Sequence, residues 1–158
     1  MMKAVELRKG KYRMDRNEAL RIIAEELKTC VIATVDEDNR PVTAVIDIMD
    51  HDENGLYFLT GRGKGLYNRL QHSPYVAATL TRGSLDTEYL AVSVRGHAVE
   101  AGPARLERLF QKNPFMYKMY PDPAKWEAAG LTVFCIDSGS VEWLTMTGPD
   151  MKREIISF

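Results

Sequence analysis

The feature that most limits how this chain can fold is an alternation of apolar and other side chains with a period of two. Within residues 42–48, Val42, Ala44, Ile46 and Ile48 alternate with the side chains between them. Successive side chains of a β-strand point to opposite faces, so this pattern is typical of a strand with one buried face. Comparable runs between turn-forming residues predict further strands at residues 30–35, 56–60, 75–81, 89–100, 131–137 and 141–146.

The short connections between these runs indicate how the strands are joined. Residues 36–41, DEDNRP, predict a hairpin turn, and residues 50–55, DHDENG, predict a second, acidic turn. Ser138-Gly139-Ser140 is expected to join the last two strands as another hairpin. Strands joined by short turns run antiparallel. The sequence therefore predicts a mainly β fold, an antiparallel sheet or small barrel with a few helices packed outside it.

Helices are predicted at three places: residues 15–29, residues 65–71, and the segment between Gly102-Pro103 and Asn113-Pro114. The first has Asp15 as a suitable N-cap, with Glu18 three residues later. Beyond the third, the proline-rich segment 113–126 is expected to be irregular, with one helical turn near Trp126.

Composition limits the classes of function. The chain has 158 residues, 45% of them hydrophobic, which suits one buried core, and residues 1–158 are treated as one domain. The 21 Lys and Arg nearly balance the 22 Asp and Glu, and a net charge of -1 predicts no nucleic-acid or membrane partner. No apolar run approaches the ~20 residues of a membrane-spanning helix, and the N-terminal segment is too polar for a secretory signal. A cytoplasmic protein is expected.

Motifs for metal binding and hydrolysis are missing from the sequence. Cys30 and Cys135 lie in apolar segments without CxxC or zinc spacing, so free buried thiols are expected. His51 lies in the acidic segment 50–55, where a solvated turn is expected in preference to a metal site. The sequence contains neither HExxH nor a nucleophile elbow. We expect no metal site and no hydrolase chemistry.

A glycine-rich loop carries the strongest chemical signal. The predicted strand ending at Thr60 is followed by GRGKG, in which three glycines alternate with Arg62 and Lys64. Such a loop can turn several backbone N–H groups toward one anion, and the helix that follows adds a partial positive charge. The loop therefore predicts a phosphate site, with Arg62 as a bidentate donor and Lys64 as a point charge. A flexible surface turn whose cations are solvated is the alternative.

Two common phosphate-binding motifs do not fit this loop. The Walker pattern GxxxxGK[ST] does not occur, because Leu66 lies five positions after Gly61. The same leucine takes the last position of the GxGxxG fingerprint, and the chain lacks the βαβ alternation that this fingerprint requires. Neither a P-loop nucleotidase nor a Rossmann fold is expected.

The order of these motifs resembles a known family. The segments NRPVTAVI, LYFLTGRGKGLYNRLQHSPYVAATL and AVSVRGHAVEA are similar to those of the FMN-binding split barrels related to pyridoxamine 5'-phosphate oxidase. The resemblance covers roughly residues 15–146 and implies an antiparallel split β-barrel. It implies that Thr60 and Lys64 contact the FMN phosphate, and that Arg62 replaces the arginine usually found next to the lysine.

The same resemblance implies where the flavin ring lies. The strand around Val45, Ile46 and Asp47 corresponds to the one whose backbone lies against the isoalloxazine ring. Trp143, directly after Glu142, corresponds to a family tryptophan that follows an acidic pair, and it joins the candidate cofactor-binding residues.

Departures from the family pattern concern the substrate side. Ala44, Met49 and Ala91 stand where full-length oxidases carry Arg, Lys and Gln, and the C-terminal segment has no Arg-x-His motif. The chain is more similar to the short general-stress and nitroimidazole-reductase-like branches. No catalytic side chain is assigned.

The function implied is that of an FMN-dependent oxidoreductase acting on a small molecule, with NADH or NADPH as possible electron donors. Two alternatives stay open: a flavin-binding or ligand-binding protein without turnover, such as a sensor or storage protein, and a barrel that binds F420 or haem. The family binds FMN between two subunits, so a homodimer is implied by the resemblance.

Overall fold

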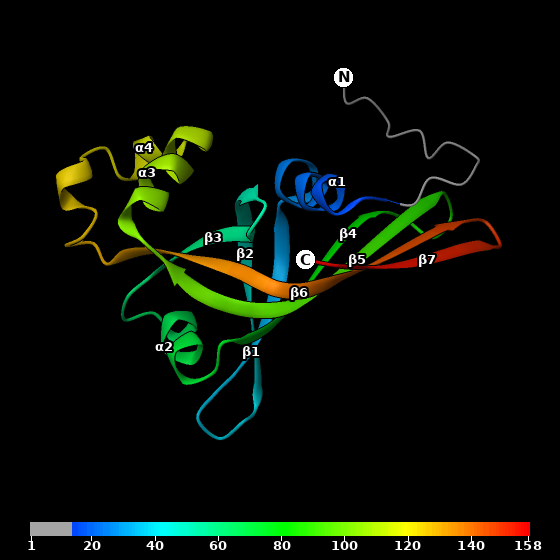
Figure 1. Ribbon diagram of the computed structural model, residues 1–158, viewed down its shortest axis with the longest axis horizontal. Coiled ribbons are helices and arrows are strands. Elements are labelled where there is room, and N and C mark those ends of the chain that lie inside the picture. The colour runs from blue at the N-terminus through cyan, green and yellow to red at the C-terminus, as the bar shows by residue number, and fades with distance from the viewer. Residues whose placement is uncertain (1–13) are drawn as a thin grey trace.

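Six antiparallel strands close into a barrel in the computed structural model, which describes residues 14–158 (Figure 1). Their order around the barrel is β3-β2-β1-β4-β5-β6, and β6 pairs with β3 to close it. This confirms the predicted split-barrel fold. The strands are β1 (Thr29–Val35), β2 (Pro41–Asp52), β3 (Gly55–Gly61), β4 (Tyr75–Gly83), β5 (Glu88–Ala101) and β6 (Leu131–Thr147).

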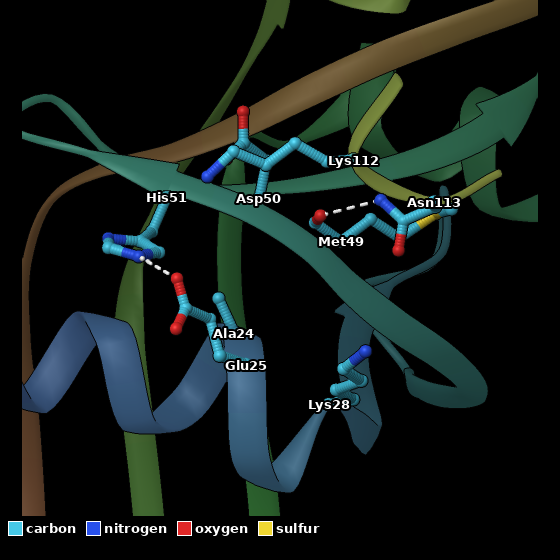
Figure 2. A pocket seen from close by; sticks show the side chains of 8 residues that line it. All are labelled: Ala24, Glu25, Lys28, Met49, Asp50, His51, Lys112 and Asn113. Carbon is cyan, nitrogen blue, oxygen red and sulfur yellow. Dashed lines mark hydrogen bonds and ion pairs between the residues drawn. The ribbon is translucent and has the colours of Figure 1, made fainter. Parts of the chain in front are cut away.

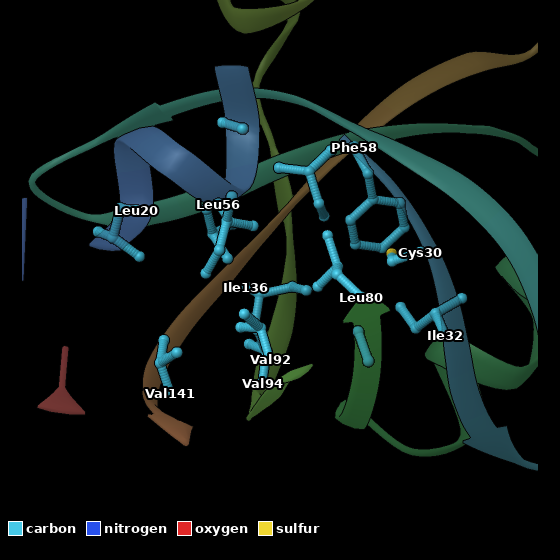
Figure 3. Close-up of a cluster of buried hydrophobic side chains, with 14 of the residues drawn as sticks. Leu20, Cys30, Ile32, Leu56, Phe58, Leu80, Val92, Val94, Ile136 and Val141 are labelled. Atoms are coloured by element: carbon cyan, nitrogen blue, oxygen red, sulfur yellow. The ribbon is translucent and has the colours of Figure 1, made fainter. Parts of the chain in front are cut away.

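Alternate side chains of these strands fill the barrel. In β4, for example, Val76, Ala78 and Leu80 are buried while the residues between them are exposed. Figure 3 shows inward side chains of the strands gathered between Phe58 and Val141, with Leu20 of the first helix next to Leu56. Burying each large apolar side chain of this kind contributes about 1.5–3 kcal/mol to folding.

The N-terminal helix begins where the sequence predicts. In α1 (Arg16–Arg21), Oδ1 of the N-cap Asp15 accepts a hydrogen bond from the backbone N–H of Glu18 at 3.0 Å. The helix continues as a π-helical segment, η1 (Ile22–Leu27), and ends at Lys28, whose φ is +57°. Its buried residues pack on the barrel core.

The other helices lie outside the barrel (Figure 1). Between β3 and β4 the chain forms α2 (Gly65–His72). Between β5 and β6 it forms α3 (Pro103–Lys112), α4 (Met116–Met119) and the 3-10 turn η2 (Pro123–Lys125). These last three enclose a second apolar cluster, in which the rings of Phe110 and Trp126 lie 4.0 Å apart between centroids. No helix within residues 14–158 is long and apolar enough to cross a membrane.

The predicted C-terminal hairpin is wrong. Residues 131–147 form one continuous strand, and a further strand, β7 (Asp150–Ser157), pairs with its second half. Ser138 and Gly139 are instead accommodated opposite Gly96, where the β5–β6 register shifts. The two backbones approach so closely that a Cβ on Gly139 would lie 2.0 Å from the carbonyl oxygen of Arg95. The Ser-Gly-Ser sequence therefore marks an irregularity within a strand.

Candidate functional site

The glycine loop lies where β3 leaves the barrel. Thr60 is 6% exposed and pairs with Thr132 of β6, and Gly61 is the last residue of the strand. Gly63 has φ +86°, a conformation that favours glycine, and Lys64 is the N-cap of α2. Thr60, Arg62 and Lys64 are thus gathered between the end of a strand and the start of a helix.

Lys64 is the cation best placed to meet an anion. Within residues 14–158 no carboxylate lies within 4.0 Å of its ammonium group. The first N–H groups of this eight-residue helix lack intrahelical partners, as in any α-helix, and no side chain caps them at Lys64. These N–H groups and the ammonium group can both interact with one bound anion.

Arg62 is already paired. Its Nη2 lies 3.1 Å from Oε1 of Glu100 on β5, and its backbone N–H donates to the carbonyl oxygen of Gly130 at 2.8 Å. The hydroxyl of Thr132 donates to the same Glu100 oxygen at 2.6 Å. The Thr132 hydroxyl and the Arg62 guanidinium together hold the pKa of Glu100 below its usual value, against a smaller opposing effect of burial.

Part of β2 has an open edge near this loop. Residues 41–47 pair with β1, but pairing with β3 begins only at Ile48, opposite Phe58. Ile46 and Thr60 each lie two residues beyond that pair, so the unpaired part of β2 starts beside the end of β3. Val45 is 71% exposed, Ile46 packs against the core, and Asp47 accepts from the Thr29 hydroxyl at 2.7 Å. Within residues 14–158, the backbone of Val45, Ile46 and Asp47 has no strand partner on this edge.

Trp143 lies apart from the loop. It is 5% exposed, belongs to the main core, and sits on β6 between Val92 of β5 and Glu154 of β7. The candidates on β2 and on the glycine loop thus lie near each other. Trp143 lies away from them, on β6, with its side chain packed in the main core.

A cleft of about 670 Å³, within the size range of small-molecule sites, is bordered mainly by residues of β1, β4, β5 and β6. Its lining combines apolar residues of β1 and β4 with Thr34, Tyr75, Arg95, His97 and the irregular segment at Ser138. Arg69 of α2 connects it to the glycine loop. Its Nε donates to the Thr34 hydroxyl at 2.7 Å, and its Nη1 lies 2.9 Å from where a Cβ on Gly65 would be.

A smaller pocket of about 190 Å³ lies beyond Met49, between β2, η1 and the end of α3 (Figure 2). Its lining is strongly polar and includes Lys28, Asp50, His51 and Lys112. Figure 2 shows His51 turned toward Glu25, with 3.1 Å between Nε2 and Oε1, and Asn113 donating to the carbonyl oxygen of Met49.

Asp50 is the most buried charge at this pocket. Its side chain is fully buried, and three cations of α3 surround it. Arg105 Nη1 and Arg108 Nε lie 3.1 and 2.8 Å from Oδ2, and Lys112 Nζ lies 3.2 Å from Oδ1. Burial alone would raise the pKa of Asp50, but hydrogen bonds from Arg108, the His51 backbone and Lys112 hold it below its usual value.

The expectation of a solvated acidic turn at His51 is wrong. Strand β2 continues through Asp52, and Asp50 is buried because the cations of α3 compensate its charge. The sequence does not reveal this arrangement, since the three partners of Asp50 lie 55 to 62 residues away along the chain. The only available signal was the spacing of Arg105, Arg108 and Lys112 on one face of a predicted helix.

Both cysteines are free and buried, as predicted. Burial, with a smaller effect of Asp47, raises the pKa of Cys30 to about 12, and burial raises the pKa of Cys135 to about 11. At neutral pH both are therefore protonated thiols with low reactivity.

Comparisons with known proteins support the fold and identify the family. The profile of the pyridoxamine 5'-phosphate oxidase family matches residues 17–141. A pyridoxine/pyridoxamine 5'-phosphate oxidase of Haemophilus influenzae is 28% identical over 100 residues, 63% of this chain but only 46% of that protein. The chain thus matches less than half of this relative's length.

Two solved structures share the fold. A NimC/NimA family protein from Clostridium acetobutylicum has a TM-score of 0.69 at 15% identity, covering 90% of this chain and 92% of that one. A heme binding protein from Mycobacterium smegmatis has a TM-score of 0.62 at 15% identity, covering 90% and 59%. With the family profile matching most of its length, the chain belongs to the pyridoxamine 5'-phosphate oxidase family.

Proposed function

We propose that this protein binds FMN, with the phosphate on the glycine loop and the ring along the open edge of β2, and that it acts as an oxidoreductase on a small molecule. The observation that carries the proposal is the position of Lys64. Its ammonium has no carboxylate partner within residues 14–158, and it stands at the start of α2, beside the unpaired part of a barrel strand.

The chain's own groups would hold the cofactor in two ways. Lys64 and the first N–H groups of α2 bind the phosphate, with Thr60 beneath the loop. The backbone of Val45, Ile46 and Asp47 supports the ring, since no strand of the described part of the chain pairs with these residues on the side away from β1. Main-chain donors and acceptors suffice for this role, so side-chain identity matters less there.

Chemistry on the substrate would take place at the far end of this strand. Bound FMN supplies hydride or electron transfer. The pocket beyond Met49 is small and polar, and its charges suit a small polar substrate better than an apolar one (Figure 2). Lys28 can orient an electron-rich group there, while Lys112 stays paired with Asp50 and Asn113 keeps the Met49 backbone in place. NADH or NADPH is the proposed electron donor.

A homodimer is part of the proposal. The outer faces of β2, β1 and β4 carry small or apolar side chains, among them Val45, Val31, Ala77 and Tyr75. Val31 pairs with Val45, so the exposed valines form one continuous patch. Such a surface is typical of an interface between subunits. A second subunit would also close the larger cleft.

A second candidate function is flavin binding without turnover. Ala44, Met49 and Ala91 favour it, because they replace the Arg, Lys and Gln with which the resemblance associates activity. Haem is a third possibility, supported by the structural likeness to a heme binding protein. The loop argues for a phosphate-bearing cofactor over haem.

The experiment that separates these functions combines a spectrum with a reduction assay. The purified protein is mixed with FMN, freed of excess ligand by gel filtration, and examined by visible absorption. A retained flavin spectrum that is bleached by NADH or NADPH and restored by an electron-poor acceptor supports the oxidoreductase. A retained spectrum that neither donor bleaches indicates a carrier or sensor. A loss of all flavin during gel filtration would refute the proposal.

A further inference from the structure

We propose that Glu100 lowers the affinity of the loop for phosphate-bearing ligands, because its ion pair with Arg62 must break before Arg62 can bind the phosphate. This inference rests on the proposed FMN site. It begins with a single carboxylate oxygen, Glu100 Oε1, which receives both the guanidinium of Arg62 at 3.1 Å and the hydroxyl of Thr132 at 2.6 Å.

The two contacts of this oxygen differ in how firmly they are fixed. Thr132 is 5% exposed and lies within β6, so its hydroxyl anchors Glu100 to the barrel wall. The Arg62 side chain is 54% exposed and extends from a glycine loop. The arginine can leave without displacing the glutamate, because Thr132 still satisfies the carboxylate.

The backbone of Arg62 is fixed separately from its side chain. Its N–H donates to the Gly130 carbonyl oxygen at 2.8 Å, and Gly130 has φ +71°. Rotation about the side-chain bonds of Arg62 is therefore enough to move the guanidinium, and the loop keeps its shape.

The Arg62 guanidinium can pair either with Glu100 or with a bound phosphate, and the charge of the partner determines which pair forms. Without ligand, Glu100 neutralises Arg62, and Lys64 is the loop's one cation without a carboxylate within 4.0 Å in residues 14–158. A half-exposed ion pair is weak. A phosphate group carries about 1.5 to 2 negative charges and accepts two parallel hydrogen bonds from an arginine. On phosphate binding Arg62 moves from Glu100 to the ligand. The free energy of the Arg62–Glu100 ion pair is lost in this step and reduces the affinity for the phosphate.

The consequence is a selectivity role for Glu100. It weakens the binding of every phosphate-bearing ligand by the free energy of its pair with Arg62. It leaves a flavin without phosphate unaffected. Glu100 is therefore a specificity-determining residue that acts through Arg62 and touches no ligand itself.

The test is a double-mutant cycle with FMN and riboflavin, followed by flavin fluorescence. Glu100→Gln keeps an acceptor for Thr132 and is expected to tighten FMN binding roughly two- to fivefold, the range of a half-exposed ion pair. Riboflavin affinity is expected to stay unchanged. In the Arg62→Gln background, the same Glu100→Gln change is expected to have no effect.

A matched control and a second ligand keep the outcomes distinct. Glu127→Gln removes an exposed carboxylate near Gly130 that makes no contact with Arg62 within the described residues, and FMN affinity should not change. If Glu100→Gln tightens FMN binding equally with and without Arg62, long-range repulsion is the cause and the inference is overturned. No change in either background also overturns it.

Failure of the proposed function would look different. If no variant takes up FMN, the flavin site itself is wrong, and the cycle is repeated with inorganic pyrophosphate, followed by the amide NMR signals of Gly63 and Gly65. The same dependence on Arg62 is expected there. An equal pyrophosphate affinity of the wild type and the Glu100→Gln variant would overturn the inference as well.

Discussion

Lys64 is the residue on which phosphate binding depends most directly. Replacing it with alanine removes the loop's one cation without a carboxylate partner in the described residues and leaves the strand and helix on either side intact. We expect Lys64→Ala to weaken FMN binding roughly tenfold to a hundredfold, the range of one charge-assisted contact. Lys125→Ala, in the exposed turn η2, is the control and should bind FMN like the wild type. Equal affinity of all three proteins in a fluorescence titration would place the phosphate elsewhere.

Asp50 of β2 pairs with three cations of α3 and so helps to attach this helix to the barrel. Asp50→Asn leaves three cations facing a neutral group, and we expect it to lower the free energy of unfolding by about 2–4 kcal/mol. Arg108 and Lys112 are partly exposed and can be hydrated, so the effect should not exceed this range. Asp38→Asn, at an exposed pair in the first hairpin, should change it by less than about 0.5 kcal/mol. Urea unfolding compares the two, and similar midpoints would contradict the role of Asp50.

The same carboxylate gives the stability a pH dependence of known sign. Its pKa is lowered in the folded protein, so between the folded and unfolded pKa values the unfolded state binds more protons. The stability that ionised Asp50 contributes is therefore fully present above its unfolded-state pKa of about 3.9. It is lost as the pH falls through the pKa of Asp50 in the folded protein. Urea midpoints measured from pH 7 down to 3 should fall less steeply for Asp50→Asn than for the wild type. Parallel curves would exclude Asp50 as the source.

At the scale of these residues, the sequence predicted the loop but not its ion pairs. Three alternating glycines after a strand are a local signal, so Arg62 and Lys64 could be proposed from the loop itself, whereas Thr60 was proposed from the family resemblance. The pairing of Arg62 with Glu100 joins residues 38 apart and depends on how β5 and β6 register. No local pattern encodes such a contact.

At the scale of elements, the β5–β6 irregularity determines whether β6 can run unbroken past Gly96. A side chain on Gly139 would collide with the Arg95 carbonyl oxygen, a backbone atom that cannot rotate away. We expect Gly139→Ser to destabilise the protein by about 2–4 kcal/mol, as other forced backbone shifts do. Gly102→Ser is the matched control, because no atom lies within 4 Å of its Cβ position and serine is a good N-cap. Thermal unfolding that ranks the two equally would contradict this reading of the strand.

The strands and helices show where local sequence is enough. Strand β4 alternates buried and exposed residues along most of its length, and α1 has a side-chain cap, so both were predicted closely. Strand β6 was divided at Ser-Gly-Ser because a turn and an irregularity within a strand use the same residues. Strand β7 was missed, since its alternation is weak and only Ile156 is buried.

At the scale of the whole molecule, the proposed homodimer would use the exposed valines of β1 and β2, Val31 and Val45. We expect the wild type to sediment as two chains, and Val45→Glu to sediment as one, because the charge would be buried at the centre of the patch. Leu85→Glu changes an equally exposed residue in the β4–β5 turn and should remain a dimer. A monomeric wild type, or a dimeric Val45→Glu variant, would contradict this interface.

The central claim is that the loop at the end of β3 binds the phosphate of FMN. Its most direct test is a titration of cofactor-free wild-type protein with FMN and, separately, with riboflavin, which lacks only the phosphate. We predict one FMN per chain, bound at least roughly tenfold more tightly than riboflavin. Equal affinity for the two flavins, or uptake of neither, would show that the loop binds no flavin phosphate.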